Sequence, residues 1–515
     1  MKMNKSGISL IVLVVTIIVL AILAAVVVIS IVNSGLVNSS KDSVKTYELA
    51  QLKSLATVAW EEALLDQNTN TPAEYASYIK AKLLDAGYTE KELSKYTILA
   101  DVNNVTVYEY EMKFYSDLLK AITTINDESY EDDSLTTTQD LACVGMYKDE
   151  NNIPHIRMLK NQAIDIAVEL ESDMVLELNG KTLSLIKENA INITAGNIVI
   201  NGSVSGSKIS VANNDQRTTI ATVNAGSLTL NGGKYETTSN GVGNDSNPNA
   251  SIIVGSTGKL NAQGIELIAS DENGATLVGI LIQNGGEASI SNSDIYVTSL
   301  NGLKSDGIRN FGTATLINTN VAAYSNYTAN AAKTDYATST RGIDNEGIMV
   351  LKNCYVYGCH SGVRSMGTLY IDGGTYEGYG HGGIYYGGSQ TISYAKNAII
   401  RLCDMKNGYD DGVAGTNKAG FYIGGASNVT VYMDKCDLYG SYYPAVLRSS
   451  GGEKNNALYI SNSKVNENMT KYIRNDGSTN KVYIGTGNNF TTSNVYKSSY
   501  AVSTTEDYGL QFPEY

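Results

Sequence analysis

The sequence contains few of the residues that build metal centres, disulfide frameworks and aromatic cores. Its 515 residues include 3 His, 5 Cys, 5 Pro, 5 Phe and 1 Trp. His155, His360 and His381 are too scattered for a zinc site and no CxxC pair is present, so neither a metal nor a cofactor is expected. An odd number of cysteines also excludes a complete set of disulfides as the source of stability.

Positive charge is scarce as well. The chain has 38 Lys and Arg against 52 Asp and Glu, a formal net charge of −14, and no basic cluster lies beyond the N-terminal region. Because neutralising a phosphate backbone requires such a cluster, nucleic acid is excluded as a partner. The abundant residues are 49 Gly and 36 Tyr, together with Asn, Ser and Thr. This composition is typical of a long β-solenoid with polar turns rather than of a helical enzyme.

One long apolar run is present, near the N-terminus. It covers residues 8–32 and, as a helix, has a length of about 37 Å, enough to cross a bilayer with some tilt. Lys2 and Lys5 precede it and favour a cytoplasmic N-terminus. We therefore expect a single-pass protein of the cell membrane, with the membrane as a partner and the remaining chain outside the cell.

Three stretches with helical signals follow the apolar run. Residues 39–67 repeat apolar side chains at steps of three and four, which indicates an amphipathic helix. Thr71, Pro72 and Gly87 suit the cap, first turn and exit of a second helix. SDLLKAITTIN begins a third helix before an acidic, solvated linker. The expected parts are a leader over residues 1–7, a transmembrane and amphipathic helix over 8–66, a small helical neck with the linker over 67–135, a solenoid over 136–497 and a tail over 498–515.

Beyond about residue 140 the sequence repeats a strand-and-turn unit. The clearest copies are GIRNFGTATLINTNV, GIDNEGIMVLKNCYV and GVRSMGTLYIDGGTY, which begin at Gly307, Gly342 and Gly362. Each copy has Gly, an aliphatic residue, three variable residues, a second Gly, an alternating apolar strand and then a small residue. The column of small residues is expected to contain Gly233, Ser293, Thr319, Cys354, Gly374, Cys403, Cys436 and Ser463.

Strands of four or five residues are too short to bury an apolar face alone, so these units must stack coil on coil with parallel pairing. The sequence therefore predicts a mainly β fold, a right-handed parallel β-helix, in which the small-residue column marks a tight corner. About a dozen coils at about 4.8 Å each give a rod of about 60 Å. A β-sandwich is disfavoured because Asn-Gly hairpin turns do not recur.

The N-terminus resembles that of a type IV prepilin or pseudopilin. A short basic leader ends in Gly7, Ile8 opens the apolar run, and Leu-Ala-Ala follows at residues 23–25. The resemblance implies that a prepilin peptidase cuts between Gly7 and Ile8 and methylates Ile8, and that other pilin-like subunits are partners. Val12 replaces the glutamate usual in that family. Because valine cannot compensate the buried amino terminus of a neighbour, we expect a minor subunit at a filament tip.

A second resemblance lies in VLELNGKTLSL, residues 175–185, which looks like the opening coil of pectate-lyase-like β-helices of bacterial surface proteins. It identifies a fold and not an activity. Because this fold is a frequent scaffold for polysaccharide lyases and hydrolases, carboxylates on its faces are candidate catalytic groups.

The catalytic candidates are Asp410 and Asp411 with His381. Paired carboxylates can act as general acid and base in glycosidic cleavage, and both stretches resemble the Asp-Asp and Gly-His-Gly motifs of polygalacturonases. Their order along the chain is reversed, however, and the Asn-Thr-Asp and Arg-Ile-Lys motifs of that family are missing. Asp-Asp-Gly is also a common polar turn, which is the favoured interpretation.

Other side chains leave two alternatives each. The carboxylates at coil corners are suitable calcium ligands. They lack the nonapeptide periodicity of calcium-binding repeats, however, and this favours solvated turn residues instead. The tyrosines suit sugar stacking or protein contact, or merely cover a sheet. For the cysteines of the small-residue column, a stack of free thiols is favoured over disulfide bridges, because their side chains point the same way. Cys143 is expected to be a buried small hydrophobic residue. The corner carboxylates are Asp344, Asp372, Asp404, Asp434 and Asp437, and the cysteines of open disulfide state are Cys354, Cys359, Cys403 and Cys436.

We expect a pilin-like surface protein whose β-helix serves adhesion or filament-tip assembly, with a glycan or a host or cell-surface molecule as ligand. A tethered polysaccharide lyase or glycoside hydrolase is the first alternative. A complete acid, base and arginine constellation on adjacent coils would favour it. The second alternative is a signal-anchored surface protein outside any filament, in which Gly7 is fortuitous.

Overall fold

The computed structural model divides the chain into two compact units, Met1–Glu111 and Met112–Tyr515. In the described part of the chain, no helix has the length and apolar character needed to cross a membrane. The predicted membrane segment and the processing site at Gly7 and Ile8 lie outside that part, as does Val12. The described residues are 40–66, 69, 71–127, 135–186, 191–212, 217–240, 243–271, 276–299, 304–325, 340–378, 381–388, 391–402, 419–424, 426–440, 443–448, 454–465, 472–496 and 498–513.

The first unit is a small α+β arrangement around one apolar cluster. Its elements are α2 (Ser40–Ala63), α3 (Pro72–Asp85), α4 (Glu90–Leu93) and the antiparallel pair β1 (Thr97–Ala100) and β2 (Val105–Tyr108). One side of α2 supplies Leu52, Ala56, Ala59 and Ala63 to the cluster. Their steps of three and four residues confirm the predicted amphipathic helix.

The second predicted helix is confirmed at both ends. The Thr71 side chain and Glu74 form a reciprocal capping box at the start of α3, with Pro72 in the first turn. Such caps satisfy backbone N–H groups that no helical carbonyl can reach. Gly87 follows the helix with a φ of 103°, which suits glycine because it has no Cβ.

The second unit opens with a cap and continues as parallel coils. The third predicted helix is α5 (Leu118–Asn126), capped by Asp117, and its buried side chains join the core of the coils. β3 (Lys113–Tyr115) and β4 (Val144–Lys148) are antiparallel to each other, and β4 is antiparallel to β5 (Pro154–Met158). From β5 onward every described strand pairing within this unit is parallel.

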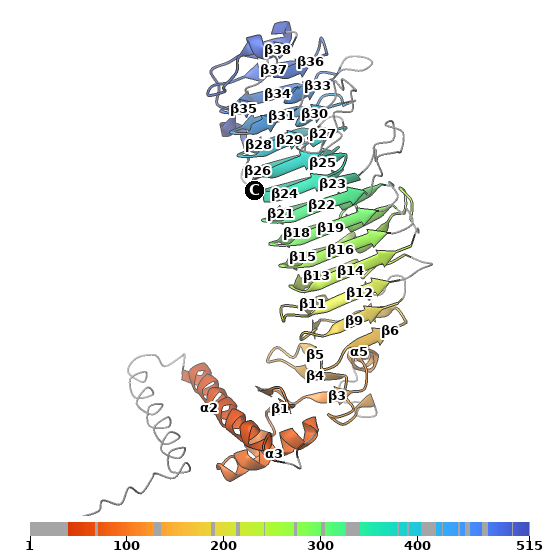
Figure 1. Ribbon diagram of the computed structural model, residues 1–515, viewed down its shortest axis with the longest axis vertical. Coiled ribbons are helices and arrows are strands. Elements are labelled where there is room, and N and C mark those ends of the chain that lie inside the picture. The colour runs from red at the N-terminus through yellow and green to blue at the C-terminus, as the bar shows by residue number, and fades with distance from the viewer. Residues whose placement is uncertain are drawn as a thin grey trace, which may run out of the picture. The chain divides into compact units, whose positions relative to one another are not determined.

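Each coil contributes strands to three faces, seen as stacked arrows in Figure 1. The first face contains β7 (Val168–Leu170), β10 (Ile191–Ile193), the starts of β13 (Ala221–Asn231) and β15 (Asn249–Gln263), β17 (Leu277–Ile282), β20 (Ser305–Asn310), β23 (Thr340–Asn345), β25 (Ser361–Ser365), β27 (Gly382–Tyr386), β30 (Phe421–Ile423), β33 (Ala445–Leu447), β36 (Ile473–Asn475) and β38 (Val495–Tyr496). The second face contains β5, β8 (Met174–Glu177), β11 (Asn197–Asn201), the ends of β13 and β15, β18 (Glu287–Ser291), β21 (Thr313–Ile317), the starts of β24 (Ile348–Gly358) and β26 (Thr368–Gly378), β28 (Ile392–Lys396), β31 (Thr430–Asp434), β34 (Ala457–Ser461), β37 (Lys481–Ile484) and β39 (Ala501–Ser503). The third face contains β6 (Gln162–Ile164), β9 (Thr182–Leu185), β12 (Lys208–Ala212), β14 (Lys234–Ser239), β16 (Glu266–Asp271), β19 (Asp294–Ser299), β22 (Asn320–Ser325), the ends of β24 and β26, β29 (Ile399–Leu402), β32 (Asp437–Tyr439) and β35 (Lys464–Val465).

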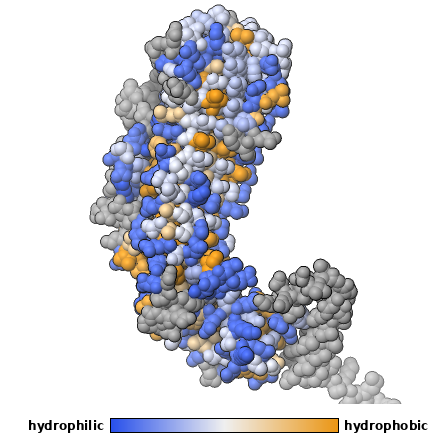
Figure 2. All heavy atoms as spheres, turned by 180° about the vertical axis from the view of Figure 1, so that it is seen from behind, coloured by the Kyte–Doolittle hydropathy of each residue, from blue (hydrophilic) through white to orange (hydrophobic). Residues whose placement is uncertain are grey.

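The mainly β fold with parallel, coil-on-coil strands is therefore confirmed. Alternate side chains of the three faces point inward, and one continuous apolar cluster runs through the coils. Hydrophilic residues dominate the face drawn in Figure 2, where apolar residues lie in separate spots. The antiparallel hairpins that a β-sandwich requires occur only around β4 among the described strands of this unit.

The repeated glycines of the sequence are a packing requirement. Gly307, Gly342 and Gly362 lie in one column of the first face, where the coils approach closely. A Cβ at Gly342 would lie 2.5 Å from Cγ1 of Val356 and 2.7 Å from the carbonyl oxygen of Tyr357. These distances are shorter than van der Waals contact, so a side chain there would push the first face away from the third face of the same coil.

The small-residue column lies at a corner between the second and third faces, as predicted. Ser, Thr and Cys are interchangeable there, because each hydroxyl or thiol donates to the carbonyl oxygen two residues earlier, over 2.7–3.5 Å. Burial raises the pKa of the Cys354 thiol to about 11 and that of Cys436 to about 12, so both are unreactive. The residues making this contact are Ser293, Thr319, Cys354, Cys436 and Ser463.

One member of the predicted column is wrong. Ile399 pairs with Thr375 on one side and Asp437 on the other, so Ala398 occupies the corner that was assigned to Cys403. Cys403 itself lies outside the described residues. The described cysteines Cys143, Cys354, Cys359 and Cys436 are all free thiols.

The boundary between the two units falls between Glu111 and Met112. Residues 67–111 of the expected neck belong to the first unit, whereas α5 packs on the coils of the second. An amphipathic helix over the first coil covers apolar side chains that the stack would otherwise expose.

Candidate functional site

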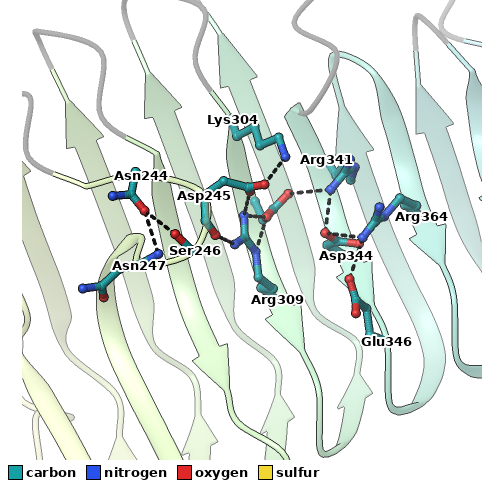
Figure 3. Close-up of polar contacts among 11 residues, drawn as sticks. Asn244, Asp245, Ser246, Asn247, Lys304, Arg309, Arg341, Asp344, Glu346 and Arg364 are labelled. Carbon is teal, nitrogen blue, oxygen red and sulfur yellow. Dashed lines mark hydrogen bonds and ion pairs between the residues drawn. The ribbon is translucent and has the colours of Figure 1, made fainter.

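A cluster of charged side chains covers the outer side of the first face where β20, β23 and β25 lie side by side (Figure 3). The strand register sets its composition. Asp306 is paired with Arg341, while Arg309, Asp344 and Arg364 follow one another on three successive coils. Carboxylates therefore alternate with guanidinium groups along the stack, as favourable cross-strand pairing requires.

Each guanidinium of this charged cluster is held by a carboxylate of its own or a neighbouring coil. Arg309 Nε donates to Asp306 Oδ2 over 2.7 Å. Asp344 accepts from Arg341 Nη1 over 2.5 Å and from Arg364 Nε over 2.5 Å. The side chains of Asp306, Asp344, Arg309 and Arg341 are at most 7% exposed. Buried charges persist only when they are paired in this way.

A rim of more exposed groups completes the charged cluster. Asp245 accepts from Arg309 through its backbone carbonyl over 2.9 Å and also pairs with Lys304. Glu346 accepts from Arg364 Nη2 over 2.8 Å. The four cations and four carboxylates balance, so the group is neutral when all are ionised. It consists of Lys304, Arg309, Arg341, Arg364, Asp245, Asp306, Asp344 and Glu346.

Asp306 is the most perturbed group of the charged cluster. Burial raises the pKa of its carboxyl to about 6, with the like charge of Asp344 acting in the same direction against Arg309 and Arg341. Its Oδ1 has no hydrogen-bond partner among the described residues and lies 4.0 Å from Arg341 Nη1. A raised carboxyl pKa suits a general acid, but this carboxyl has 0% exposure and no path to a substrate within the described structure.

His381, the histidine of the catalytic candidates, lies beside His360 on the preceding coil. His381 Nδ1 and His360 Nε2 are 2.5 Å apart, and the His381 ring also packs against Tyr385 and Tyr422 at 5.0 and 5.3 Å between centroids. Burial lowers the pKa of His381 to about 4 and that of His360 to about 2, with nearby Arg341 acting in the same direction. Both rings are therefore neutral at pH 7 and bonded to each other.

The other catalytic candidates, Asp410 and Asp411, lie outside the described residues, so the predicted acid–base pair stays a prediction. Within the described ranges, no group of three or more His, Cys, Asp or Glu side chains is placed to hold a metal ion. Of the corner carboxylates proposed for calcium, Asp344 pairs with arginines and Asp372 with Lys396. Asp434 accepts from Ser461 and Asn462. Asp404 lies outside the described part.

The second face carries a ladder of stacked tyrosines on its outer side. Ring centroids of successive members are 5.4, 5.3, 4.7 and 4.3 Å apart, with interplanar angles of 6°, 12°, 17° and 4°. This tyrosine ladder consists of Tyr370, Tyr394, Tyr432, Tyr459 and Tyr483. Stacking of this kind contributes about 0.5–1.5 kcal/mol for each pair beyond area burial.

The tyrosine ladder changes what these residues can bind. Within it, ring faces lie against the faces of neighbouring rings, so the interior members present their edges and hydroxyls outward. Flat stacking of a sugar on Tyr394, Tyr432 or Tyr459 is thereby excluded. Two tyrosines outside the ladder, Tyr376 and Tyr386, are at most 1% exposed inside the coils.

Sequence reasoning missed both the charged cluster and the tyrosine ladder. The ladder has a readable signal, because four of its tyrosines stand three residues before the corner residue with positive φ, at Gly373, Asn397, Lys435 and Asn462. The cluster also has a signal, because Arg309, Asp344 and Arg364 each stand two positions after the repeated Gly of the aligned copies. Comparison of the chain with family models, curated proteins and solved structures gives no match.

Proposed function

We propose that the chain is a pilin-like, membrane-inserted protein that displays a right-handed parallel β-helix at the cell surface, for adhesion or for assembly at a filament tip. The leader that ends at Gly7 and the apolar run over residues 8–32 support membrane insertion. The parallel coils of the second unit support the β-helix. Handedness, processing and filament entry are the parts of the proposal that await experiment.

The charged cluster is the observation that carries the choice of binding over cleavage. An enzyme that cleaves glycosidic bonds needs a carboxylic acid and a carboxylate that reach the substrate. Asp306 and Asp344 instead bind arginines of their own stack and are at most 4% exposed. The two buried carboxylates of the charged cluster are thus held by arginines away from solvent and are not placed to act on a substrate.

The first unit supports a role in display. Helix α2 begins at Ser40, shortly after the predicted membrane segment, and one of its sides is fixed to α3 and the β1–β2 pair through Leu52, Ala56 and Ala59. The buried apolar contacts make α2 part of a rigid unit rather than a free linker. Because α2 is packed into the first unit, it connects the predicted membrane segment to that unit without a free linker inside the helix.

A tethered polysaccharide lyase or glycoside hydrolase is the second candidate, and one observation favours it. Carboxylates and arginines do gather on adjacent coils of the first face, as such an enzyme requires. Their mutual pairing and burial count against it. Asp410 and Asp411 would have to supply the catalytic pair instead.

Intact-mass analysis of the membrane-extracted protein tests the pilin-like part of the proposal. We expect a chain that begins at Ile8 and carries one additional methyl group. Retention of Met1, or a start beyond Val28, would contradict processing at Gly7. Those outcomes would leave a signal-anchored or secreted surface protein as the better description.

A further inference from the structure

The C-terminal tail turns back and lies along the tyrosine ladder. The 3-10 helix η4 (Tyr508–Gln511) places the Tyr508 ring 5.2 Å from the Tyr459 centroid, and Tyr508 is 5% exposed. The Tyr508 N–H donates to Ser461 Oγ over 3.0 Å, and Asn462 Nδ2 donates to Asp507 Oδ1 over 3.1 Å. The tail is thus tied to coils that precede it by more than forty residues in sequence.

Phe512 ends this return and forms one wall of a cavity. Its ring lies 5.5 Å from the Tyr394 centroid in an edge arrangement, and Lys396 Nζ lies 5.7 Å from the Phe512 centroid. Lys396 in turn pairs with Asp372 over 3.1 Å. Aromatic packing on one side and an ammonium group over the ring therefore fix the position of Phe512.

A cavity of 540 Å³ lies between this wall and the coils at the end of the tyrosine ladder. Its volume is within the range of about 300–1,000 Å³ that is usual for small-molecule sites. Val350 follows Tyr370 in the outward column of the second face, so an aliphatic side chain stands where the next ring of the ladder would be. The lining side chains used below are Val350, Lys352, Tyr370, Asp372, Lys396 and Phe512.

The chemistry of this lining matches a sugar ring. Tyr370 and Phe512 come from different elements and provide aromatic surface, which packs on the C–H face of a pyranose. Asp372, Lys352 and Lys396 surround that surface with a carboxylate and ammonium groups, which accept from and donate to sugar hydroxyls. The lining thus combines two aromatic rings with three charged groups around them.

We propose that this tail cavity binds a pyranose residue of a glycan. The proposal rests on the adhesive function proposed above and gives that function a ligand class. It places recognition at the end of the tyrosine ladder, where the C-terminal tail supplies Phe512. The interior of the ladder, whose rings cover one another, contributes rigidity.

Saturation-transfer NMR on the full chain tests the proposal, in a detergent without a sugar headgroup. The probes are the methyl β-pyranosides of glucose, galactose and N-acetylglucosamine at millimolar concentration. We expect transfer to the ring C–H protons of at least one probe. Phe512→Ala should weaken binding at least tenfold, whereas Phe512→Tyr should restore it.

Leu510→Ala is the matched control, because Leu510 lies in the same tail, is 83% exposed and is not part of the cavity lining. It should bind the probe as the unchanged chain does. The absence of transfer for all three probes, or binding that is unchanged in Phe512→Ala, would overturn the tail cavity as a sugar site. Processing at Gly7 does not depend on this cavity, so a negative titration with an Ile8 start rejects the cavity assignment alone.

Discussion

The outer sides of the first and second faces solve the same stacking problem in different ways. In both, side chains of successive coils stand about 4.8 Å apart in columns. Tyrosine rings can repeat at that spacing because they attract one another, and the ladder from Tyr370 to Tyr483 does so. Charges cannot repeat, so Arg309, Asp344 and Arg364 alternate in sign.

The difference decides where ligand binding is to be sought. In the charged column the buried carboxylates are held by arginines of their own stack, so the groups that resemble a catalytic site are already bound. The last ring of an aromatic ladder, here Tyr370, has no further ring on one side. Val350 occupies the next position of the column instead. In this chain the tail encloses that end and forms a cavity. The carboxylates and arginines of the charged cluster therefore hold one another, and the tyrosine ladder leads to the candidate ligand site.

The largest effect is expected when the charged cluster loses the carboxylate shared by two arginines. Asp344→Asn leaves Arg341, 7% exposed, with only Asp306 at 4.0 Å, while Arg364 keeps Glu346. Breaking a buried pair in this way costs about 3–5 kcal/mol. Urea unfolding should show this loss in the free energy of unfolding. Glu346→Gln is the control, since Glu346 is 34% exposed and should cost about 1 kcal/mol or less. A loss below about 1 kcal/mol at Asp344 would mean that the cluster is solvated and open to a substrate.

A smaller effect is expected from the middle of the tyrosine ladder. Tyr432→Ala removes stacking with both Tyr394 and Tyr459, and we expect the free energy of unfolding to fall by about 2 kcal/mol. Tyr432→Phe keeps the ring and should stay within about 0.5 kcal/mol of the unchanged protein, because its hydroxyl points away from the stack. Equal losses in the two variants would show that the hydroxyl, rather than ring stacking, holds the ladder together.

The histidine pair makes the first face sensitive to acid. The folded pKa of His381 is about 4, below its unfolded value near 6.5, so its contribution is complete above pH 6.5 and is lost as pH falls toward 4. At pH 5.5 the loss from His381 is on the order of 1 kcal/mol. Asp306 has a raised pKa and opposes it, because protonation of its buried carboxyl favours the folded state as pH falls through about 6.

His381→Phe checks this sign. The variant keeps an aromatic ring between Tyr385 and Tyr422 but cannot bind a proton. The difference in unfolding free energy between pH 7.5 and 5.5 should be smaller in the variant by about 1 kcal/mol. An identical pH dependence would show that His381 titrates at its ordinary pKa and is accessible to water.

The smallest effect on stability is expected from an exposed ion pair that, like the charged cluster, joins directly paired residues of neighbouring coils. Lys259 and Glu287 pair across β15 and β18 over 2.8 Å, and their side chains are 58% and 57% exposed. Water screens this pair, so Lys259→Ala should change the free energy of unfolding by about 0.5 kcal/mol or less. A loss of unfolding free energy as large as that of Asp344→Asn would contradict the view that burial makes the ion pairs of the charged cluster important for stability.

The sequence predicted the coils because their steric requirements are local. Gly342 must leave room for Val356 across its own coil, and the hydroxyl or thiol at Thr319 and Cys354 must reach a carbonyl two residues earlier. These conditions are the same in each copy, so the residues recur at fixed offsets. The register failed at Cys403 because loop lengths vary from coil to coil. Ala398 stands five positions earlier and fits the corner equally well without a polar atom.

The contacts of the charged cluster were missed although the aligned copies carry them. Arg309, Asp344 and Arg364 each stand two positions after the repeated Gly, so opposite charges meet on neighbouring coils. The orientation of the tyrosine rings could not be predicted, because the number of tyrosines does not distinguish a ring stacked on its neighbours from a ring whose face is exposed. The return of Phe512 to Tyr394 depends on a tail without any repeat.

The most direct test of the central claim is an assay for turnover by the purified full chain. It would be incubated with pectins, glucans and cell-wall glycans, and reducing ends and unsaturated products would be measured over time. The account predicts no release above that of a heat-denatured sample, because the described carboxylates Asp306 and Asp344 of the first face are buried against arginines. Release that persists in native protein and disappears in Asp411→Asn, with unchanged unfolding, would contradict it and establish the enzyme.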